Sequence, residues 1–552
     1  MTSEKAFILD GYVDEPACLG VSPYISPYVR YCAGACIENG FSVSYTTIDE
    51  LRKNPSLLLD MEKADLFVFI AGITVPGKYL GGTPANSKDI FRIGTSLKNP
   101  VKCLGGPVLF GSSSGGGTPA EKESYSSVYD YILEGEISGA LDSVLKGGKP
   151  HGVFSYPDID RRSAAGSCVI KQHPAYPHVI CELETARGCS RAACGGCSFC
   201  TEYLYGTPCY RSEKGVFGEV SALYNAGALH FRLGRQPDLL TYQASSGEEF
   251  PVPVPEKIDS LLRGIRDAAF GLKTLHIDNI NPGTITRHPV ESKEALESIV
   301  KWHTAGDTAA FGMESADPEV IRCNNLKAMP EDVLRAVRIV NDIGAKRDKN
   351  GVPHLLPGLN FVMGLCGETK NTYFLNESFL SSLLKSGLLV RRVNIRQVMP
   401  FEGTKAYTEN TLGKFDESFK AFKETVRRDF DLPMLKKVFP QGTVLLDAVV
   451  EVSGDMSFAR QLGSYPILIG VPYRLIKGSV GDFFVADWGY RSVTGFEKPF
   501  NVNKASFNTL KKLPGIGKKT AADIILKRPF NSLNEFEKVS GRHFYSDFIT
   551  FD

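Results

Sequence analysis

The chain has 552 residues, 43% of them hydrophobic, so general disorder is excluded and several folded domains are expected. Its formal net charge of +1 excludes a chain-wide attraction to nucleic acid. Its 13 cysteines stand singly outside one cluster, which excludes a disulfide framework. The N-terminus enters a strand pattern without a signal peptide, and every apolar stretch is too short to cross a membrane. We therefore expect a cytoplasmic protein without membrane contact.

Residues 1–150 alternate between strand and helix patterns. The expected strands are Ala6–Leu9, Phe41–Tyr45, Asp65–Ile70, Val101–Leu104 and Tyr131–Leu133. Four of the five end in a turn that contains glycine, which is typical of a doubly wound, Rossmann-like parallel sheet. Such a sheet binds ligands beyond the carboxyl ends of its strands, although the same pattern also suits an α/β domain without a ligand.

A second α/β series follows a Pro- and Ser-rich segment, residues 151–177, which we interpret as a linker. The series covers residues 178–435, and its expected strands are Val179–Glu184, His230–Leu233, Thr274–Asp278, Ala309–Gly312, Gly358–Met363 and Arg392–Val398. Six strands separated by helical stretches predict a partial (β/α)6 barrel, in which chemistry takes place at the carboxyl ends of the strands.

The remaining residues form two smaller predicted units. Residues 436–500 contain three short strand patterns and predict a small β-rich unit. Residues 501–552 contain Leu513-Pro-Gly-Ile-Gly-Lys-Lys-Thr520 between two helical stretches, which is a helix-hairpin-helix signature. Its glycine turn, with Lys518 and Lys519 beside it, could bind a phosphate of nucleic acid, or the unit could be a helical brace or docking module.

The most informative pattern is a cluster of four cysteines, Cys189, Cys194, Cys197 and Cys200. Thiolates at this spacing indicate a metal or iron–sulfur site, and a structural zinc site would use all four. The cluster follows the first barrel strand and has no distant second pair of ligands, which favours a catalytic centre over zinc. Three different triplets of these cysteines could provide the ligands.

Arg187-Gly-Cys189 together with Cys197-Ser-Phe-Cys200 resembles the cluster motif of radical SAM enzymes. The resemblance implies a 4Fe-4S cluster held by Cys189, Cys197 and Cys200, with an open iron for S-adenosylmethionine, while Cys194 is the alternative third ligand. The family usually has a shorter first spacing, and its Gly-Gly-Glu motif is here Gly234-Arg-Gln236. The resemblance implies SAM contacts from Phe199, Arg235, Gln236, Glu314 and Ser315.

An α/β domain in front of such a barrel resembles the cobalamin-dependent radical SAM methyltransferases. The resemblance implies a cobalamin between sheet and barrel, without a histidine ligand from below, because the domain has no Asp-x-His-x-x-Gly motif. The implied cobalamin contacts are Asp10, Tyr12, Gly72, Thr74, Gly105, Gly106, Pro107, Gly135 and Glu136. At the end of the third barrel strand, His276, Asp278 and Asn279 are substrate candidates, or they support the barrel.

The implied reaction is methylation of an unactivated sp3 carbon through a 5′-deoxyadenosyl radical and methylcobalamin, with no separate catalytic residue. Within the family, the chain most resembles the glutamine C-methyltransferases of methanogenic archaea. That implies Cα of a glutamine in the alpha subunit of methyl-coenzyme M reductase as substrate, and a ferredoxin or flavodoxin as electron donor. The alternatives are a radical SAM enzyme that modifies RNA by methylthiolation or methylation, and a zinc-containing nucleic-acid-binding protein.

Overall fold

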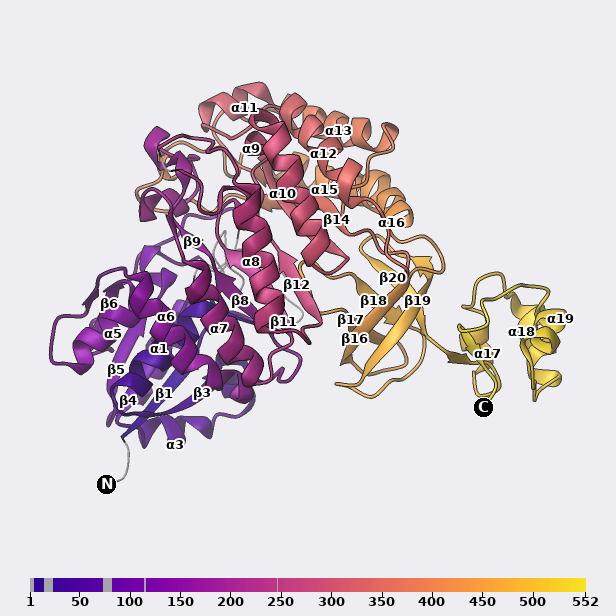
Figure 1. Ribbon diagram of the computed structural model, residues 1–552, viewed down its shortest axis with the longest axis horizontal. Coiled ribbons are helices and arrows are strands. Elements are labelled where there is room, and N and C mark those ends of the chain that lie inside the picture. Colours follow the sequence, from indigo (N-terminus) through magenta and orange to yellow (C-terminus); the bar gives the residue numbers. More distant parts are fainter. Residues whose placement is uncertain (1–3, 14–22, 73–81, 114–115, 246) are drawn as a thin grey trace.

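The computed structural model describes residues 4–13, 23–72, 82–113, 116–245 and 247–552, which form an α/β body and a smaller C-terminal part (Figure 1). The N-terminal sheet is parallel, with the order β3-β1-β4-β5-β6-β7. Its strands are β1 (Lys5–Asp10), β3 (Ser42–Thr47), β4 (Leu66–Ile70), β5 (Val101–Gly105), β6 (Tyr131–Gly135) and β7 (His151–Gly152). All five predicted strands are present, and β4 is buried along its whole length, as a strand covered on both faces requires. The strand order reverses between β1 and β4, where such folds bind ligands.

Helices cover this sheet, and the predicted linker adds to them. They are α1 (Pro27–Glu38), α2 (Ile48–Lys53), α3 (Leu57–Glu62), α4 (Ser87–Ser96), α5 (Ile137–Leu145), α6 (Tyr156–Ala165) and the 3-10 helix η2 (Gly166–Gln172). Residues 151–177, which we interpreted as a linker, are therefore largely helical. Pro157 lies in the first turn of α6, where proline favours a helix start. Helix α6 packs on α1 so closely that a Cβ on Gly34 would lie 2.0 Å from the Arg162 carbonyl oxygen.

The central part is the predicted partial barrel. Its strands are β8 (Ile180–Glu184), β11 (His230–Arg235), β12 (Thr274–Ile277), β13 (Asp307–Glu314), β14 (Leu355–Met363) and β15 (Arg392–Gln397). All are parallel, and a bridge between Asn279 and Ala310 joins the two halves of the series. A short strand that the sequence did not predict, β2 (Tyr24–Ile25), extends from the N-terminal part and pairs with β8.

Proline begins five of the helices around the barrel. The helices are α7 (Glu213–Asn225), α8 (Pro255–Ala268), α9 (Pro282–Arg287), α10 (Pro289–Trp302), α11 (Pro318–Cys323), α12 (Pro330–Gly344), α13 (Lys370–Lys385), α14 (Lys405–Thr408), α15 (Asp416–Thr425), π-helix η6 (Val426–Asp431) and α16 (Leu432–Val438). Proline has no N–H to satisfy and a preset φ angle, so the sequence itself marks where α8 to α12 begin. No helix among the described residues is long and apolar enough to span a membrane.

The C-terminal part starts with a closed five-stranded barrel in the order β16-β17-β18-β20-β19. Its strands are β16 (Val444–Val452), β17 (Ser457–Arg460), β18 (Leu468–Val471), β19 (Val480–Trp488) and β20 (Ser492–Glu497), and the predicted pattern had identified only β16, β18 and β19. Beyond it lie the helices α17 (Phe507–Leu510), α18 (Lys518–Leu526) and α19 (Leu533–Ser540). Two short strands that flank these helices in sequence, β21 (Phe500–Asn501) and β22 (Ile549–Thr550), pair with each other. The predicted fold class, an α/β body with a small β unit and a helical hairpin, is confirmed.

The loop between β17 and β18, residues 461–467, enters the amino-terminal end of the partial barrel. Thr274 donates a hydrogen bond to the carbonyl oxygen of Leu462 at 2.9 Å, and its hydroxyl also lies 2.9 Å from Nδ1 of His230. Since the threonine proton is used, Nδ1 of His230 must carry the proton between them. Burial lowers the pKa of His230 to about 4, so the ring is neutral at pH 7.

Acidification should weaken the contact between the β-rich unit and the partial barrel. Because the folded pKa of His230 lies below the ordinary histidine value of 6.5, its contribution to stability is complete above pH 6.5 and is lost as the pH falls toward 4. The loss amounts to about 1.4 kcal/mol for each unit of pKa difference. We expect urea-unfolding midpoints at pH 7 and pH 5 to differ less in His230→Gln than in the wild type. Equal differences in the two proteins would contradict the assignment.

Candidate active site

The cysteine loop follows β8 and is closed by a two-stranded ribbon. Strand β9 (Ala186–Arg187) pairs antiparallel with β10 (Cys209–Tyr210), and the loop between them contains η3 (Ser190–Cys194) and η4 (Glu202–Tyr205). Gly196 has φ of +68°, and a Cβ there would lie 2.4 Å from the ring of Tyr203. Glycine is therefore required at this turn, which directs the last two cysteines of the cluster back toward the barrel.

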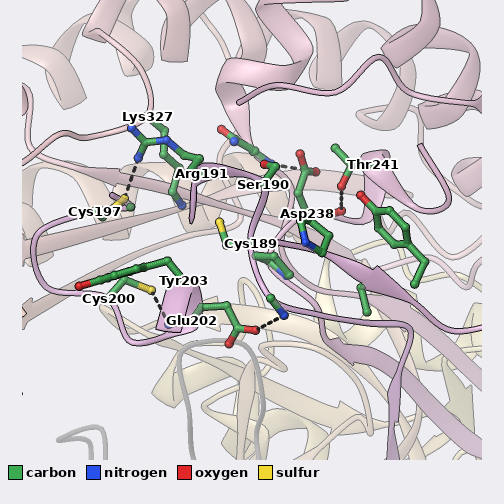
Figure 2. A pocket seen from close by; sticks show the side chains of 17 residues that line it. Cys189, Ser190, Arg191, Cys197, Cys200, Glu202, Tyr203, Asp238, Thr241 and Lys327 are labelled. Carbon is green, nitrogen blue, oxygen red and sulfur yellow. Dashed lines mark hydrogen bonds between the residues drawn. The ribbon is translucent and has the colours of Figure 1, made fainter. Parts of the chain in front are cut away.

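Three of the four cysteines line one pocket at the carboxyl end of the barrel. These are Cys189, Cys197 and Cys200, and Figure 2 shows their sulfurs around a common space. Cys194 is exposed, does not line the pocket, and donates its thiol hydrogen to the Arg191 carbonyl oxygen at 3.2 Å. Among the described residues, no group of three or more His, Cys, Asp or Glu side chains is arranged around a single-ion site.

Arg191 holds the buried thiol of Cys197. Its guanidinium donates to the Cys197 sulfur at 2.9 Å and to the Asn325 carbonyl oxygen at 2.8 Å, and it pairs with Glu249 at 2.9 Å. Burial raises the pKa of Cys189 to about 11, and it also raises the pKa values of Cys197 and Cys200. The three thiols are therefore neutral at pH 7 without a bound metal, and metal binding there must release protons.

A partly buried cation lines the pocket and pairs with a buried carboxylate next to it. Lys327 is among the lining residues (Figure 2). Its ammonium lies 3.9 Å from Glu314 at the end of β13, a residue that is not itself part of the lining. Burial lowers the pKa of Lys327, but the Glu314 carboxylate, together with the thiolates that the three cysteines form at high pH, outweighs burial and raises that pKa overall. Glu314 has φ of +58°, and its Oε2 atom is buried without a hydrogen-bond partner in the described part of the chain. Neighbouring Ser315 is fully buried and accepts from the Asp317 backbone N–H.

The end of β11 contributes two predicted residues with different roles. Arg235 donates two hydrogen bonds to Glu202, at 2.8 and 2.7 Å, and stacks on the ring of Tyr205, so it anchors the cysteine loop. Gln236 donates through its amide nitrogen to the carbonyl oxygens of Leu233 and Asn279. Its amide oxygen is buried and, among the described residues, lacks a partner.

Two residues of the pocket were missed by the sequence analysis, and none of the five predicted SAM contacts is among the residues that line it. Lys327 lies in a connection after α11, about 130 residues beyond the cysteines, and no local pattern marks it. Asp238 lines the pocket, accepts from the Thr284 hydroxyl at 2.7 Å, and has a pKa raised to about 6 by burial. Phe199, a predicted contact, packs in a small apolar cluster with Cys197 and Cys200.

The three substrate candidates lie at the end of β12, and two of them, His276 and Asp278, contact the inserted loop. His276 accepts from the Ser464 N–H at 2.8 Å, and Asp278 accepts from the Tyr465 hydroxyl at 3.2 Å and pairs with Arg232. Asn279 donates to the Gln236 carbonyl oxygen at 3.1 Å. All three therefore have protein partners, and Asn279 connects this strand end to the orphan amide of Gln236.

The predicted cobalamin contacts divide into two groups. Asp10, Tyr12 and Gly72 meet at the ends of β1 and β4, where Gly72 N–H donates to the Tyr12 carbonyl oxygen at 2.9 Å. Asp10 is fully buried, accepts from the Tyr45 hydroxyl at 2.9 Å and from the Tyr12 N–H at 2.8 Å, and has a pKa raised to about 7 by burial. Thr74 lies outside the described residues.

The second group packs against protein. A Cβ on Gly106 would lie 2.4 Å from the Ala71 carbonyl oxygen, Gly105 packs against Ile137, and Pro107 begins the 3-10 helix η1 (Pro107–Phe110). A Cβ on Gly135 would lie 2.3 Å from the Gly152 carbonyl oxygen. Glu136 caps α5 by accepting from the backbone N–H groups of Ser138 and Gly139. Close packing against the protein therefore explains why glycine stands at positions 105, 106 and 135.

The N-terminal sheet and the partial barrel contact each other beyond the carboxyl ends of these strands. The N–H of Gly117 donates to the Val398 carbonyl oxygen, and the N–H of Ala120 donates to that of Pro400. Phe110, Met399 and Phe401 form an apolar cluster with Ala120 across this junction. The carboxyl ends of β5 and β15 are thereby brought to one place.

Solved structures share this architecture. A structure of the radical S-adenosylmethionine methyltransferase TsrM from Kitasatospora setae, with tryptophan substrate and a SAM analog bound, has a TM-score of 0.50 at 14% identity and covers 73% of this chain and 75% of that chain. A second TsrM structure, with cobalamin and a [4Fe-4S] cluster bound, has a TM-score of 0.50 at 12% identity over 73% of this chain and 74% of that chain. At these identities the likeness shows a common fold.

Sequence relatives cover nearly the whole chain. The helix-hairpin-helix family model matches residues 496–541, which confirms the predicted motif. An uncharacterized protein of Archaeoglobus fulgidus is 43% identical over 540 residues, 98% of each chain, and one of Methanocaldococcus jannaschii is 43% identical over 506 residues, 89% of this chain and 93% of that protein. The chain belongs to the same family as these two archaeal proteins.

Proposed function

We propose that the protein is a cobalamin-dependent radical SAM methyltransferase that acts on an unactivated carbon. The observation that carries the proposal is the pocket itself, in which Cys189, Cys197 and Cys200 surround one space on a fold shared with TsrM. Three thiolates suit a four-iron cluster with one open iron. The loaded cofactors would supply a 5′-deoxyadenosyl radical and a transferable methyl group, and the protein would supply binding and orientation.

The buried acceptors beside the pocket fit S-adenosylmethionine. The unpartnered amide oxygen of Gln236 can accept from an ammonium group, and the unpartnered Oε2 of Glu314 can accept from a hydroxyl or an ammonium. A buried acceptor without a donor costs free energy in the empty protein, so a ligand that supplies donors recovers that cost. Lys327 offers a positive charge to a carboxylate in the same pocket.

Cobalamin would lie between the Rossmann-like sheet and the barrel. The junction of β5 with β15 brings both carboxyl ends to one place, and the strand order of the sheet reverses at Asp10 and Gly72. Asp10, Tyr12 and Gly72 remain our proposed contacts. Glu136 already caps the start of α5, and Gly135 packs against the backbone of β7. We therefore expect these two residues to position the backbone of the site.

Replacing Gln236 tests the SAM assignment. A hydrogen bond to a charged group contributes about 1.5–3 kcal/mol, so Gln236→Leu should weaken SAM binding about 10- to 100-fold. Equilibrium dialysis with the reconstituted protein measures this directly, and Gln441→Leu, at an exposed turn position, is the matched control. Equal SAM affinity in the two variants would remove Gln236 from the site.

Anaerobic reconstitution with iron, sulfide and cobalamin tests the function as a whole. We expect about four irons per chain, cobalamin uptake, and release of 5′-deoxyadenosine from SAM when a reductant is supplied. Cluster assembly without cobalamin uptake would contradict the methyl-transfer route. Zinc binding without iron uptake would contradict the radical route entirely.

We further propose a protein or peptide substrate, and the finer assignment is Cα of a glutamine in the alpha subunit of methyl-coenzyme M reductase, with a ferredoxin or flavodoxin as donor. The sequence resemblance alone supports this assignment. Mass spectrometry of a peptide from that subunit, after incubation with the loaded enzyme, should show a gain of one methyl group on glutamine. A peptide of unchanged mass would remove this substrate.

A further inference from the structure

The last strand of the partial barrel presents two arginines on its inner face. Side chains alternate along a strand, so Arg392, Asn394 and Arg396 of β15 point to one side, and Val393 and Ile395 point to the other. Val393 and Ile395 are buried in the main hydrophobic core. We call Arg392, Asn394 and Arg396 the arginine face.

Contacts place the arginine face inside the barrel. The Arg392 guanidinium carbon lies 4.4 Å from the ring centroid of Tyr465, whose hydroxyl donates to Asp278 on the inner face of β12. The Asn394 side chain donates to Asn360 of β14 at 3.3 Å. Both residues therefore face polar side chains in the interior of the barrel.

The charges in the barrel interior do not balance. Arg232, the inner cation on β11, is paired with both Glu182 and Asp278. Arg392 and Arg396, by contrast, make no hydrogen bond or ion pair with any described residue, although neither is exposed.

Burial lowers the pKa of Arg392 to about 10, and the neighbouring Arg396 and Arg491 contribute to the lowering. The carboxylate of Asp431 offsets this only in part, because it is already paired with Arg491 at 2.9 Å. The cost of burying a cation with so little counter-charge is retained where a ligand provides the missing anion.

We propose that the arginine face binds an oxyanion of the substrate, a carboxylate or a phosphate, and this inference rests on the proposed function. Guanidinium groups bind both oxyanions through paired hydrogen bonds. Four residues of strand span roughly 13 Å, so the face fits an extended substrate. Asn394 and Asn360 between the two arginines add amide donors and acceptors. Because the strand starts at Arg392 and runs toward the cysteine pocket, an anion held here leaves the rest of the substrate directed to that pocket.

Calorimetric titration of the full-length protein tests the site without turnover. Tricarballylate represents a carboxylate source and pyrophosphate a phosphate source, and we expect at least one to bind the wild type with a millimolar or lower Kd. Arg392→Gln and Arg396→Gln should each weaken that binding about tenfold or more, and the probe that binds identifies the source. Arg338→Gln removes an exposed arginine of α12 and should bind like the wild type.

Absence of binding by both probes, or equal binding by wild type and Arg392→Gln, would overturn the proposal. Circular dichroism spectra of the variants establish that they are folded. Reductive cleavage of SAM by the loaded wild type, measured without substrate, separates the two levels of inference. Cleavage without anion binding rejects the arginine face and leaves the proposed function standing, whereas absence of cleavage rejects the proposed function itself.

Discussion

Cys197→Ala should abolish assembly of the iron–sulfur cluster, whereas Cys194→Ala should retain it. Cys197 is buried in the pocket and accepts a hydrogen bond from Arg191, so its loss removes a ligand that nothing nearby can replace. Cys194 is exposed, and its thiol is directed to the Arg191 carbonyl oxygen. We expect iron content after anaerobic reconstitution to fall from about four per chain to near zero in Cys197→Ala. Cys189→Ala and Cys200→Ala should behave in the same way.

Cys194→Ala and Cys189→Ala together decide which of these two cysteines is the third cluster ligand, beside Cys197 and Cys200. Loss of the cluster in Cys194→Ala, with the cluster retained in Cys189→Ala, would reverse the assignment. Cys209, an exposed cysteine on β10 outside the pocket, provides a control for general effects of thiol removal. Cys209→Ala should take up iron like the wild type. SAM cleavage should follow iron content across the series.

The sequence predicted the strands well because their buried runs end in glycine turns. The run Leu66-Phe-Val-Phe-Ile70 is apolar throughout and is fully buried in the sheet. The prolines that begin α8 to α12 marked helix starts equally clearly. Strands β17 and β20 were missed because buried positions in them are interrupted by partly buried ones, so neither has a continuous apolar run, and β2 was missed because two residues carry no periodicity.

The candidate site was predictable where its residues are close in sequence. Cys189, Cys197 and Cys200 share one loop, whereas Gln236 and Glu314 were indicated by the family resemblance and stay predictions. Asp238 follows the same strand as Gln236, but no motif marks it, and Lys327 reaches the pocket only through the fold. Arg392 and Arg396 carry an ordinary strand pattern, and only the absence of a partner among the described residues distinguishes them.

Removal of one carboxylate should loosen the Rossmann-like part from the barrel. Glu219 of α7 is fully buried, and it accepts from Arg30 of α1 at 2.7 and 2.9 Å and from Arg211. Because these partners come from both parts of the chain, the carboxylate lies at the centre of their interface. Burial raises the pKa of Glu219, but the two guanidinium groups outweigh it and lower that pKa overall.

We expect Glu219→Gln to lower the free energy of unfolding by about 3–5 kcal/mol, because it leaves the buried Arg30 without its counter-charge and leaves Arg211 paired with Asp160 alone. Urea unfolding followed by circular dichroism measures the change, and Glu297→Gln at an exposed position of α10 is the control. The carboxylate's contribution is present above its unfolded pKa of about 4.5 and is lost as the pH falls through the lower folded pKa. The difference between wild type and Glu219→Gln should therefore shrink on strong acidification. A loss no larger than that of Glu297→Gln at neutral pH would show that the interface is held by its apolar contacts, and that the ion pairs contribute only to its specificity.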